Sequence, residues 1–183
     1  MKRALLFFGL ALGLAACSGH TVHRVEVDLL SFVPEADRSG ELVGLGELRI
    51  PDDPAGQPVP VPGAEALLDG RIAFEAALEN TGTTPATLDL EVRMAPEGDT
   101  DLYDGSGGDL QVAQQSLTLG PGEKGTLRLN HELRPGDPAF DLVKGGNFRI
   151  GARLTLSGDQ VSYTLTQGEV VLRLKLFNLI PNP

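Results

Sequence analysis

The strongest signal in this sequence is an alternation of apolar and polar residues with a period of two, which recurs along most of the chain. In segment 25–29, apolar residues at 25, 27 and 29 alternate with Glu26 and Asp28, the pattern of a strand with one face in solvent. The same alternation marks segments 72–78, 88–94, 127–133, 148–156 and 170–176, and weaker candidates lie at 41–50, 110–119 and 160–166. The sequence therefore predicts eight or nine short strands.

Many short strands with one apolar face must bury those faces against a second sheet. We therefore predict an all-β fold, a single antiparallel β-sandwich of about eight or nine strands. A chain of 183 residues with 41% hydrophobic content is enough for one such core. Glycine and proline supply the backbone angles of turns, and turn-forming clusters separate the strand candidates at 80–82, 120–122, 134–138 and 157–159.

Two segments depart from the strand pattern. Residues 63–70, GAEALLDG, have a helical pattern over about two turns. Residues 51–63 contain five prolines, which exclude a helix or a central strand. A boundary there would leave residues 21–50 too small to bury a core of their own, so we interpret 51–63 as a long surface connection inside one domain.

The last strand candidate, 170–180, is apolar on both faces, with Val171 and Phe177 on one face and Leu172, Leu174 and Leu176 on the other. Such a strand is central in its sheet, covered by another element, or offered to a partner. We favour a central strand.

The N-terminus has the layout of an export signal. Lys2 and Arg3 provide the positive start, an apolar run extends from Ala4 to Ala16, and small residues follow. The run is shorter than the roughly 20 apolar residues that cross a bilayer. The sequence therefore predicts an exported domain, and its single cysteine, Cys17, excludes an internal disulfide.

The end of this signal, 14-LAAC-17, resembles the lipobox of bacterial lipoproteins. The resemblance implies that Cys17 is lipidated and becomes the first mature residue. In lipoproteins of two-membrane bacteria, a residue other than Asp after the cysteine goes with export to the outer membrane, and here that residue is Ser18. The alternative is an ordinary secretory signal that is cut nearby, for example after Ser18.

On this interpretation residues 1–16 are a signal peptide, 17–21 a short lipidated tether and 22–183 the β-sandwich domain. Loss of residues 1–16 leaves 13 basic and 25 acidic residues, a formal net charge of −12. Such a domain repels nucleic acid and anionic headgroups, so membrane contact must come from the lipid. Four residues separate Cys17 from the first strand candidate, a reach of roughly 15 Å, which keeps the domain near the membrane.

Two internal segments resemble parts of immunoglobulin-like sandwiches. The stretch 74-FEAALENTGTTPATLDLEVRM-94 is similar to the strand, Asn-containing turn, strand unit of that class, and 117-LTLGPGEKGTLRL-129 is similar to its hairpin with the pattern L-x-P-G-E. Their order resembles that of late-embryogenesis-type (WHy) and CARDB-like bacterial domains, over about residues 70–157. The resemblance implies an immunoglobulin-like sandwich. It implies no activity, because such folds carry many functions.

An acidic, glycine-rich stretch, 98-GDTDLYDGSGGD-109, is the candidate for a calcium loop. Calcium prefers six to eight oxygen ligands, and a loop of this kind can supply them. The EF-hand spacing fails, because Asp104 stands where that motif needs glycine and Leu110 where it needs glutamate. The alternative is a solvated loop in which Asp and Gly are turn residues. The candidate ligands are Asp99, Asp101, Asp104 and Asp109.

Other constellations give weaker support. His20 and His23 lie close to Cys17, but lipidation would use the thiol that a transition metal needs. His131 lies in the apolar register of its strand, as a half-buried structural histidine does. Motifs for a nucleophilic serine and for a phosphate-binding loop fail at required glycines.

We therefore expect no enzyme and no cofactor apart from the calcium alternative. The expected function is a lipid-anchored exported lipoprotein of the bacterial cell envelope, facing the periplasm, with a binding or structural role toward an envelope protein or polymer. Two alternatives remain: a hydrolase that uses acidic residues, helped by calcium, and a carrier of lipid or other apolar ligands in a sandwich cleft.

Overall fold

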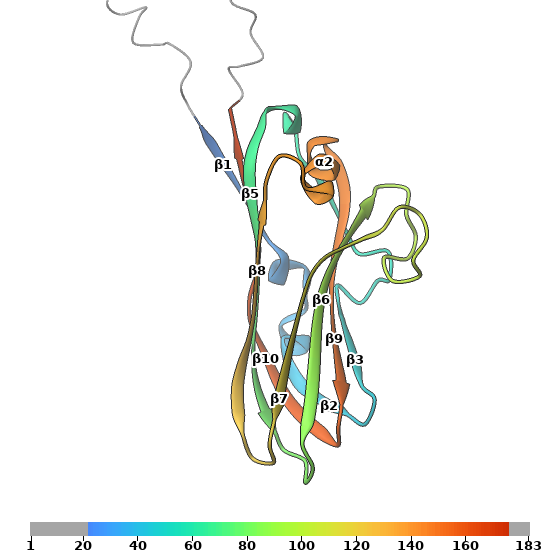
Figure 1. Ribbon diagram of the computed structural model, residues 1–183, viewed down its shortest axis with the longest axis vertical. Helices are drawn as coiled ribbons and strands as arrows, with labels where there is room; N and C mark the ends of the chain where they lie inside the picture. The colour runs from blue at the N-terminus through green and yellow to red at the C-terminus, as the bar shows by residue number, and fades with distance from the viewer. Residues whose placement is uncertain (1–21, 176–183) are drawn as a thin grey trace, which may run out of the picture.

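The protein is an all-β sandwich, as the alternation predicts. The computed structural model describes residues 22–175, in which ten strands form two five-stranded antiparallel sheets that face each other (Figure 1). We call them sheet A and sheet B. Among residues 22–175, no helix has the length and apolar character needed to cross a membrane.

Sheet A has the strand order β1-β10-β5-β8, with β2 also paired to β10. Its strands are β1 (His23–Asp28), β2 (Ser39–Val43), β5 (Leu67–Asn80), β8 (Lys124–Leu133) and β10 (Gln160–Leu174). β10 lies between β5 on one side and β1 and β2 on the other. The prediction of a central strand is therefore confirmed for residues 170–174; residues 176–183 lie outside the described part.

Sheet B has the order β3-β9-β6-β7, with β4 also paired to β9. Its strands are β3 (Glu47–Ile50), β4 (Gln57–Pro60), β6 (Ala86–Pro96), β7 (Leu110–Leu119) and β9 (Asn147–Ser157). Short helical turns complete the fold: η1 (Leu29–Phe32), η2 (Glu35–Asp37), η3 (Ala64–Ala66) and α2 (Pro138–Lys144).

The core lies between the sheets and follows the alternation of the strands. Along β6, the even-numbered positions from Leu88 to Met94 are buried, whereas Asp89, Glu91 and Arg93 face outward. Helix α2 closes one end of the sandwich between the sheets (Figure 1), where Phe140 and its apolar neighbours are buried. β6 thus uses one face for the core and leaves the other face polar.

Three expectations need correction. The helical pattern at 63–70 yields only η3, and Leu67 already begins β5, because the residues that follow alternate as a strand. The turn-forming cluster at 134–138 ends inside a helix for which we predicted no helical pattern: residues 138–144 form α2, capped by the Asp137 side chain, which accepts a hydrogen bond from the Ala139 N–H. The segments 160–166 and 170–174 form one strand, β10, with a register shift between Leu165 and Gln167.

The proline-rich segment 51–63 runs along the edge of sheet B. β4 within it pairs only with β9, beside the stretch of β9 that pairs with β3. Since proline lacks a backbone donor, an edge position is the one compatible with Pro58 and Pro60. The prediction that this segment forms no central strand is therefore confirmed.

Both ends of the described chain lie at the same end of the sandwich (Figure 1). His23 in β1 pairs with Leu174 in β10. The β2–β3, β5–β6, β7–β8 and β9–β10 turns gather at the opposite end (Figure 1), where Asn80 pairs with Val161 and Glu79 with Lys124. We call this the distal end. β10 has 15 residues, so the two ends are separated by roughly 50 Å at about 3.3 Å per residue.

Candidate functional site

The predicted lipidation site, Cys17, lies outside the described residues, as does His20. The structure places His23 at the start of β1, one position after the expected start of the domain at Val22. Within residues 22–175, no three His, Cys, Asp or Glu side chains are gathered in a way that could hold a metal ion.

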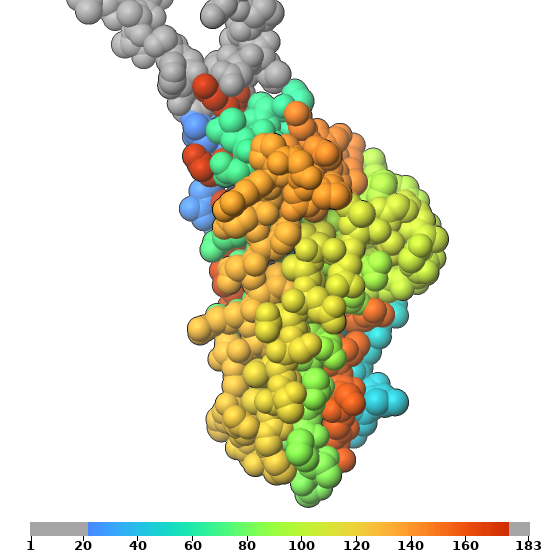
Figure 2. Space-filling model, viewed as in Figure 1, coloured from blue at the N-terminus to red at the C-terminus, as the bar shows by residue number. Residues whose placement is uncertain are grey.

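The predicted calcium ligands lie in the loop between β6 and β7, which stands out from the side of the sandwich (Figures 1 and 2). Asp99, Asp101 and Asp104 each accept a hydrogen bond from the backbone N–H two residues later. Asp109 instead pairs with Arg93 of β6 at 3.0 Å. Each of the four carboxylates therefore stabilises the loop through a separate hydrogen bond or ion pair. Calcium binding at this loop stays a prediction.

This loop is fixed to the sandwich by Leu102. Its side chain is fully buried, and its N–H donates to the carbonyl of Pro54 in the proline-rich segment. A β-carbon at Gly56 would lie 2.4 Å from a Leu102 methyl group, and one at Gly151 would lie 2.8 Å from it. Two glycines therefore make the space that Leu102 fills. The acidic loop is a packed part of the fold.

Beside Leu102, Tyr103 lies on the outer face of sheet B. The guanidinium carbons of Arg153 and Arg49 lie 4.5 Å and 5.2 Å from its ring centroid, within the range of cation–π attraction. Arg153 also pairs with Glu91 across β9 and β6. In the described part of the chain, the Tyr103 hydroxyl is buried without a hydrogen-bond partner. The result is a compact network of alternating charges around one phenol.

Burial raises the pKa of the Tyr103 phenol well above its usual range, and the nearby Glu91 adds to this effect while Arg153 and Arg49 oppose it. The pKa of Tyr163, the other tyrosine of the chain, is also raised, first by burial and then by Asp37. The Tyr103 phenol is therefore neutral in the folded protein at pH values where a free tyrosine ionises, and the pKa of Tyr163 lies above that of a free tyrosine.

We expect an alkaline titration followed by absorbance at 295 nm to show less tyrosinate at pH 10.5 in the folded protein than in the unfolded chain, because folding raises the pKa of both phenols. The same titration in denaturant should show both phenols ionised with a midpoint of about 10. Because the folded pKa values exceed the unfolded value, this contribution to stability is complete below about pH 10 and is lost as the pH rises further. A folded-state midpoint of about 10 for both phenols would contradict the burial described here.

His131 behaves as the sequence suggests. Its side chain is half-buried, with 28% exposed, and its Nε2 lies 2.8 Å from Oδ2 of Asp137, the residue that caps α2. The pair joins β8 to the start of the helix. The role of His131 in this geometry is structural.

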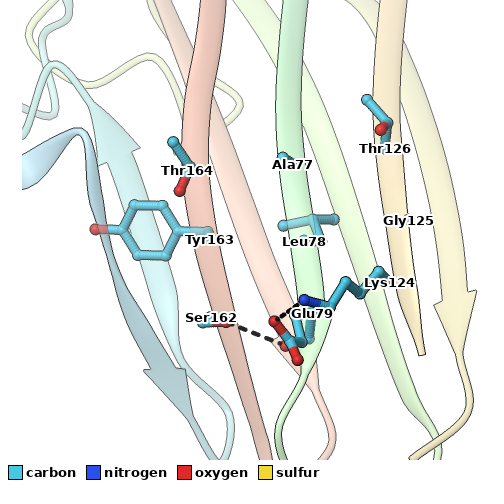
Figure 3. A pocket seen from close by; sticks show the side chains of 9 residues that line it. All are labelled: Ala77, Leu78, Glu79, Lys124, Gly125, Thr126, Ser162, Tyr163 and Thr164. Atoms are coloured by element: carbon cyan, nitrogen blue, oxygen red, sulfur yellow. Dashed lines mark hydrogen bonds and ion pairs between the residues drawn. The ribbon is translucent and has the colours of Figure 1, made fainter. Parts of the chain in front are cut away.

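A shallow groove of about 400 Å³ crosses the outer face of sheet A near the distal end (Figure 3). Its central row consists of short side chains in register, Thr164 of β10, Ala77 of β5 and Thr126 of β8. Glu79 and Lys124 form an ion pair of 3.0 Å in the next row, which Figure 3 shows on the distal side. The groove is polar, open and electrically balanced.

A second hollow, of about 270 Å³, opens at the edge of the sandwich where η1 and η2 cross between the sheets. We call it the edge cleft. Phe32, Val33 and Tyr163 line it together with Leu48 at the start of sheet B. Asp37 and Asp52 also line it. It combines an apolar wall with carboxylates, which makes it the cavity best suited to a small ligand.

Sequence reasoning missed the edge cleft and the network around Tyr103. The residues of the cleft are up to 131 positions apart, and none belongs to a recognisable motif. One local signal was present for the network: an apolar pair, Leu102 and Tyr103, interrupts an otherwise acidic loop. Such a pair indicates packing against the body of the protein.

Comparison with known proteins gives no family for the chain. No family model matches it, and no curated protein does. Among solved structures, it is similar to a capsid chain in particles derived from infectious bursal disease virus, with 11% identity and a TM-score of 0.48 over 88% of this chain and 33% of that chain. It thus spans about a third of the viral chain.

Two smaller proteins give weaker similarity. For PirA, the identity is 13% and the TM-score 0.33, over 77% of this chain and 97% of that chain. For TmCBM61, solved with β-1,4-galactotriose, the identity is 10% and the TM-score 0.30, over 81% of this chain and 90% of that chain. Similarity at this level carries no information about function.

Proposed function

We propose that this protein is an exported bacterial lipoprotein, anchored to the outer membrane through a lipid on Cys17 and facing the periplasm, where its sandwich has a binding or structural role in the envelope. The observation that carries the proposal is the position of Cys17 behind a charged start and an apolar run, six residues before β1 begins. A cysteine at that place resembles the lipobox of lipoproteins.

The arrangement of the sandwich supports this proposal. β1 begins at His23 and pairs with the last residues of β10, so a tether that precedes β1 would leave the sandwich at the end opposite the distal turns. A chain of five residues between Cys17 and His23 reaches at most about 20 Å. With the lipid in a membrane, the four distal turns would point away from it.

The charge of the domain also supports lipid as the means of attachment. The mature chain would carry a formal net charge of −12, which is repelled by anionic headgroups. Two or three acyl chains overcome this repulsion, because each buried methylene contributes about 0.8 kcal/mol.

Replacement of Cys17 by alanine tests the anchor. We expect Cys17→Ala to abolish incorporation of labelled palmitate and to release the protein from the membrane fraction, because the thiol is the atom that carries the lipid. His20→Ala, a change three residues away in the same tether, should leave both labelling and fractionation as in the parent protein. Lipid-modified Cys17→Ala protein in the membrane fraction would refute the proposal.

A further inference from the structure

The edge cleft has an aromatic side and an apolar floor. Phe32, the last residue of η1, is 43% exposed at its mouth. Tyr163 is 8% exposed and its hydroxyl donates to the backbone carbonyl of Asp37 at 3.3 Å, which holds the ring in place. Val33 and Leu48 complete the apolar lining. Two aromatic rings therefore line a cavity that a small molecule can enter.

The side chains that line the cleft include more acidic than basic groups. Asp37 and Asp52 are exposed at its rim, and within residues 22–175 neither carboxylate forms a salt bridge. Arg49 also lines the cleft, but its guanidinium pairs with Glu47 and lies 5.2 Å from the ring centroid of Tyr103. The guanidinium that lines the cleft is thus already paired with a carboxylate, and Arg38, next to Asp37 in the chain, donates from its Nε to the carbonyl of Val33.

This combination selects one kind of ligand. Aromatic rings attract cations through their negative faces, and carboxylates attract them through charge, whereas both disfavour anions. The apolar floor adds affinity for a hydrocarbon substituent. The strong negative charge of the whole domain raises the local concentration of cations further.

We infer that the edge cleft binds a small organic cation, an ammonium group that carries an apolar substituent. The ammonium lies at the rim beside Asp37 and Asp52, and the substituent enters between Phe32 and Tyr163. This inference is independent of the proposed lipid anchor, because all of its residues belong to the sandwich.

The test uses the full chain with Cys17→Ser and benzyltrimethylammonium as the probe. We expect saturation-transfer NMR to show contact of the benzyl protons with the protein, and chemical-shift titration to give a dissociation constant on the order of 0.1–1 mM. Benzyl alcohol, which has the same ring without the charge, should bind at least tenfold more weakly. Raising the salt concentration should weaken binding of the cation, since the carboxylates are exposed.

Two variants locate the site. Asp37→Asn combined with Asp52→Asn should weaken binding of the cation by about tenfold, because each exposed carboxylate contributes a modest charge interaction. Phe32→Ala should weaken binding of both probes. Glu65→Gln, which removes another exposed carboxylate, on η3, is the control and should bind as the parent protein does.

Equal affinity for benzyl alcohol and for the cation would overturn the inference, as would unchanged binding by the Asp37 and Asp52 double variant. Absence of saturation transfer at 10 mM cation would overturn it as well. Circular dichroism of each variant verifies that the sandwich is folded. These outcomes are independent of Cys17. Failure of the cation-binding test would therefore leave the proposed lipid anchor unaffected, because the Cys17→Ala experiment tests the anchor separately.

Discussion

Replacing Asn80 with alanine should lower the free energy of unfolding by about 3–5 kcal/mol, the largest effect that we expect from a single polar residue. The Asn80 side chain is fully buried, donates to the carbonyls of Thr84 and Leu119, and accepts from the Gly82 N–H. Its backbone adds bonds to Gly122 and Glu123 in the neighbouring turn. Alanine would remove all three side-chain bonds and take the Asn80 donor from the Leu119 carbonyl, where the bond is buried.

Urea unfolding followed by circular dichroism measures this change, and the melting temperature should fall by on the order of 10 °C. Asn130→Ala, at an exposed position of β8, is the matched control and should change stability by less than about 0.5 kcal/mol. Asn80→Asp should be no better than Asn80→Ala, because a carboxylate cannot donate to two carbonyls. A loss below 1 kcal/mol for Asn80→Ala would show that Asn80 does not join the two turns.

Replacing Gly56 with alanine should cost about 2–4 kcal/mol and release the acidic loop from the sandwich. Gly56 has a φ of 71°, and its β-carbon would lie 2.4 Å from a Leu102 methyl group and 2.8 Å from the carbonyl oxygen of Ile150. The methyl group can move. The carbonyl cannot, because Ile150 is paired on both sides in sheet B.

Hydrogen exchange of the backbone amides measures the local effect, and we expect faster exchange at Leu102, whose N–H donates to Pro54. Gly98→Ala is the matched control. It lies in the same acidic loop, and in the described part of the chain no atom outside its neighbours lies within 4 Å of the added methyl group. Equal stability of the two variants would contradict the packing of Leu102 against Gly56.

The sandwich could be predicted because its cause is local and repeated. The alternation along β5, β6, β8 and β9 indicates which face of each strand is buried. This local pattern is sufficient to predict the strands of a sheet. The turn at Asn80 was also visible, although its three side-chain bonds were not. The hydrogen bond from Asn80 to the Leu119 carbonyl joins residues 39 positions apart, so no local sequence pattern predicts it.

The errors have equally physical causes. Helix α2 is only seven residues long, and its start, Asp137-Pro138, is as typical of a turn as of a capped helix. The sequence pattern divides β10 into two segments, because the register shift after Leu165 breaks its alternation. Near the shift, Gly168 leaves room for Leu30 of η1, since a β-carbon at this glycine would lie only 3.2 Å from a Leu30 methyl group. That contact depends on tertiary packing.

The candidate site was the least predictable part. The acidic loop can be predicted from its local content of Asp and Gly. Its packing through Leu102 cannot, because it depends on glycines about 50 residues away on either side in the sequence. The edge cleft needs Phe32, Asp52 and Tyr163 together, and only the folded sandwich brings them to one place. Lipidation of Cys17 remains a prediction of the sequence.

The pairing of β1 with β10 has a mechanical consequence. β1 runs from His23 toward the distal end, antiparallel to β10, with six residue pairs between them. Under the proposed anchoring, a load applied at the distal turns and resisted at Cys17 pulls along the axis of β1. Hydrogen bonds in an antiparallel ladder are perpendicular to the strands, so this load shears all six pairs at once instead of peeling them apart in sequence. Under that anchoring, the domain would be oriented to withstand tension.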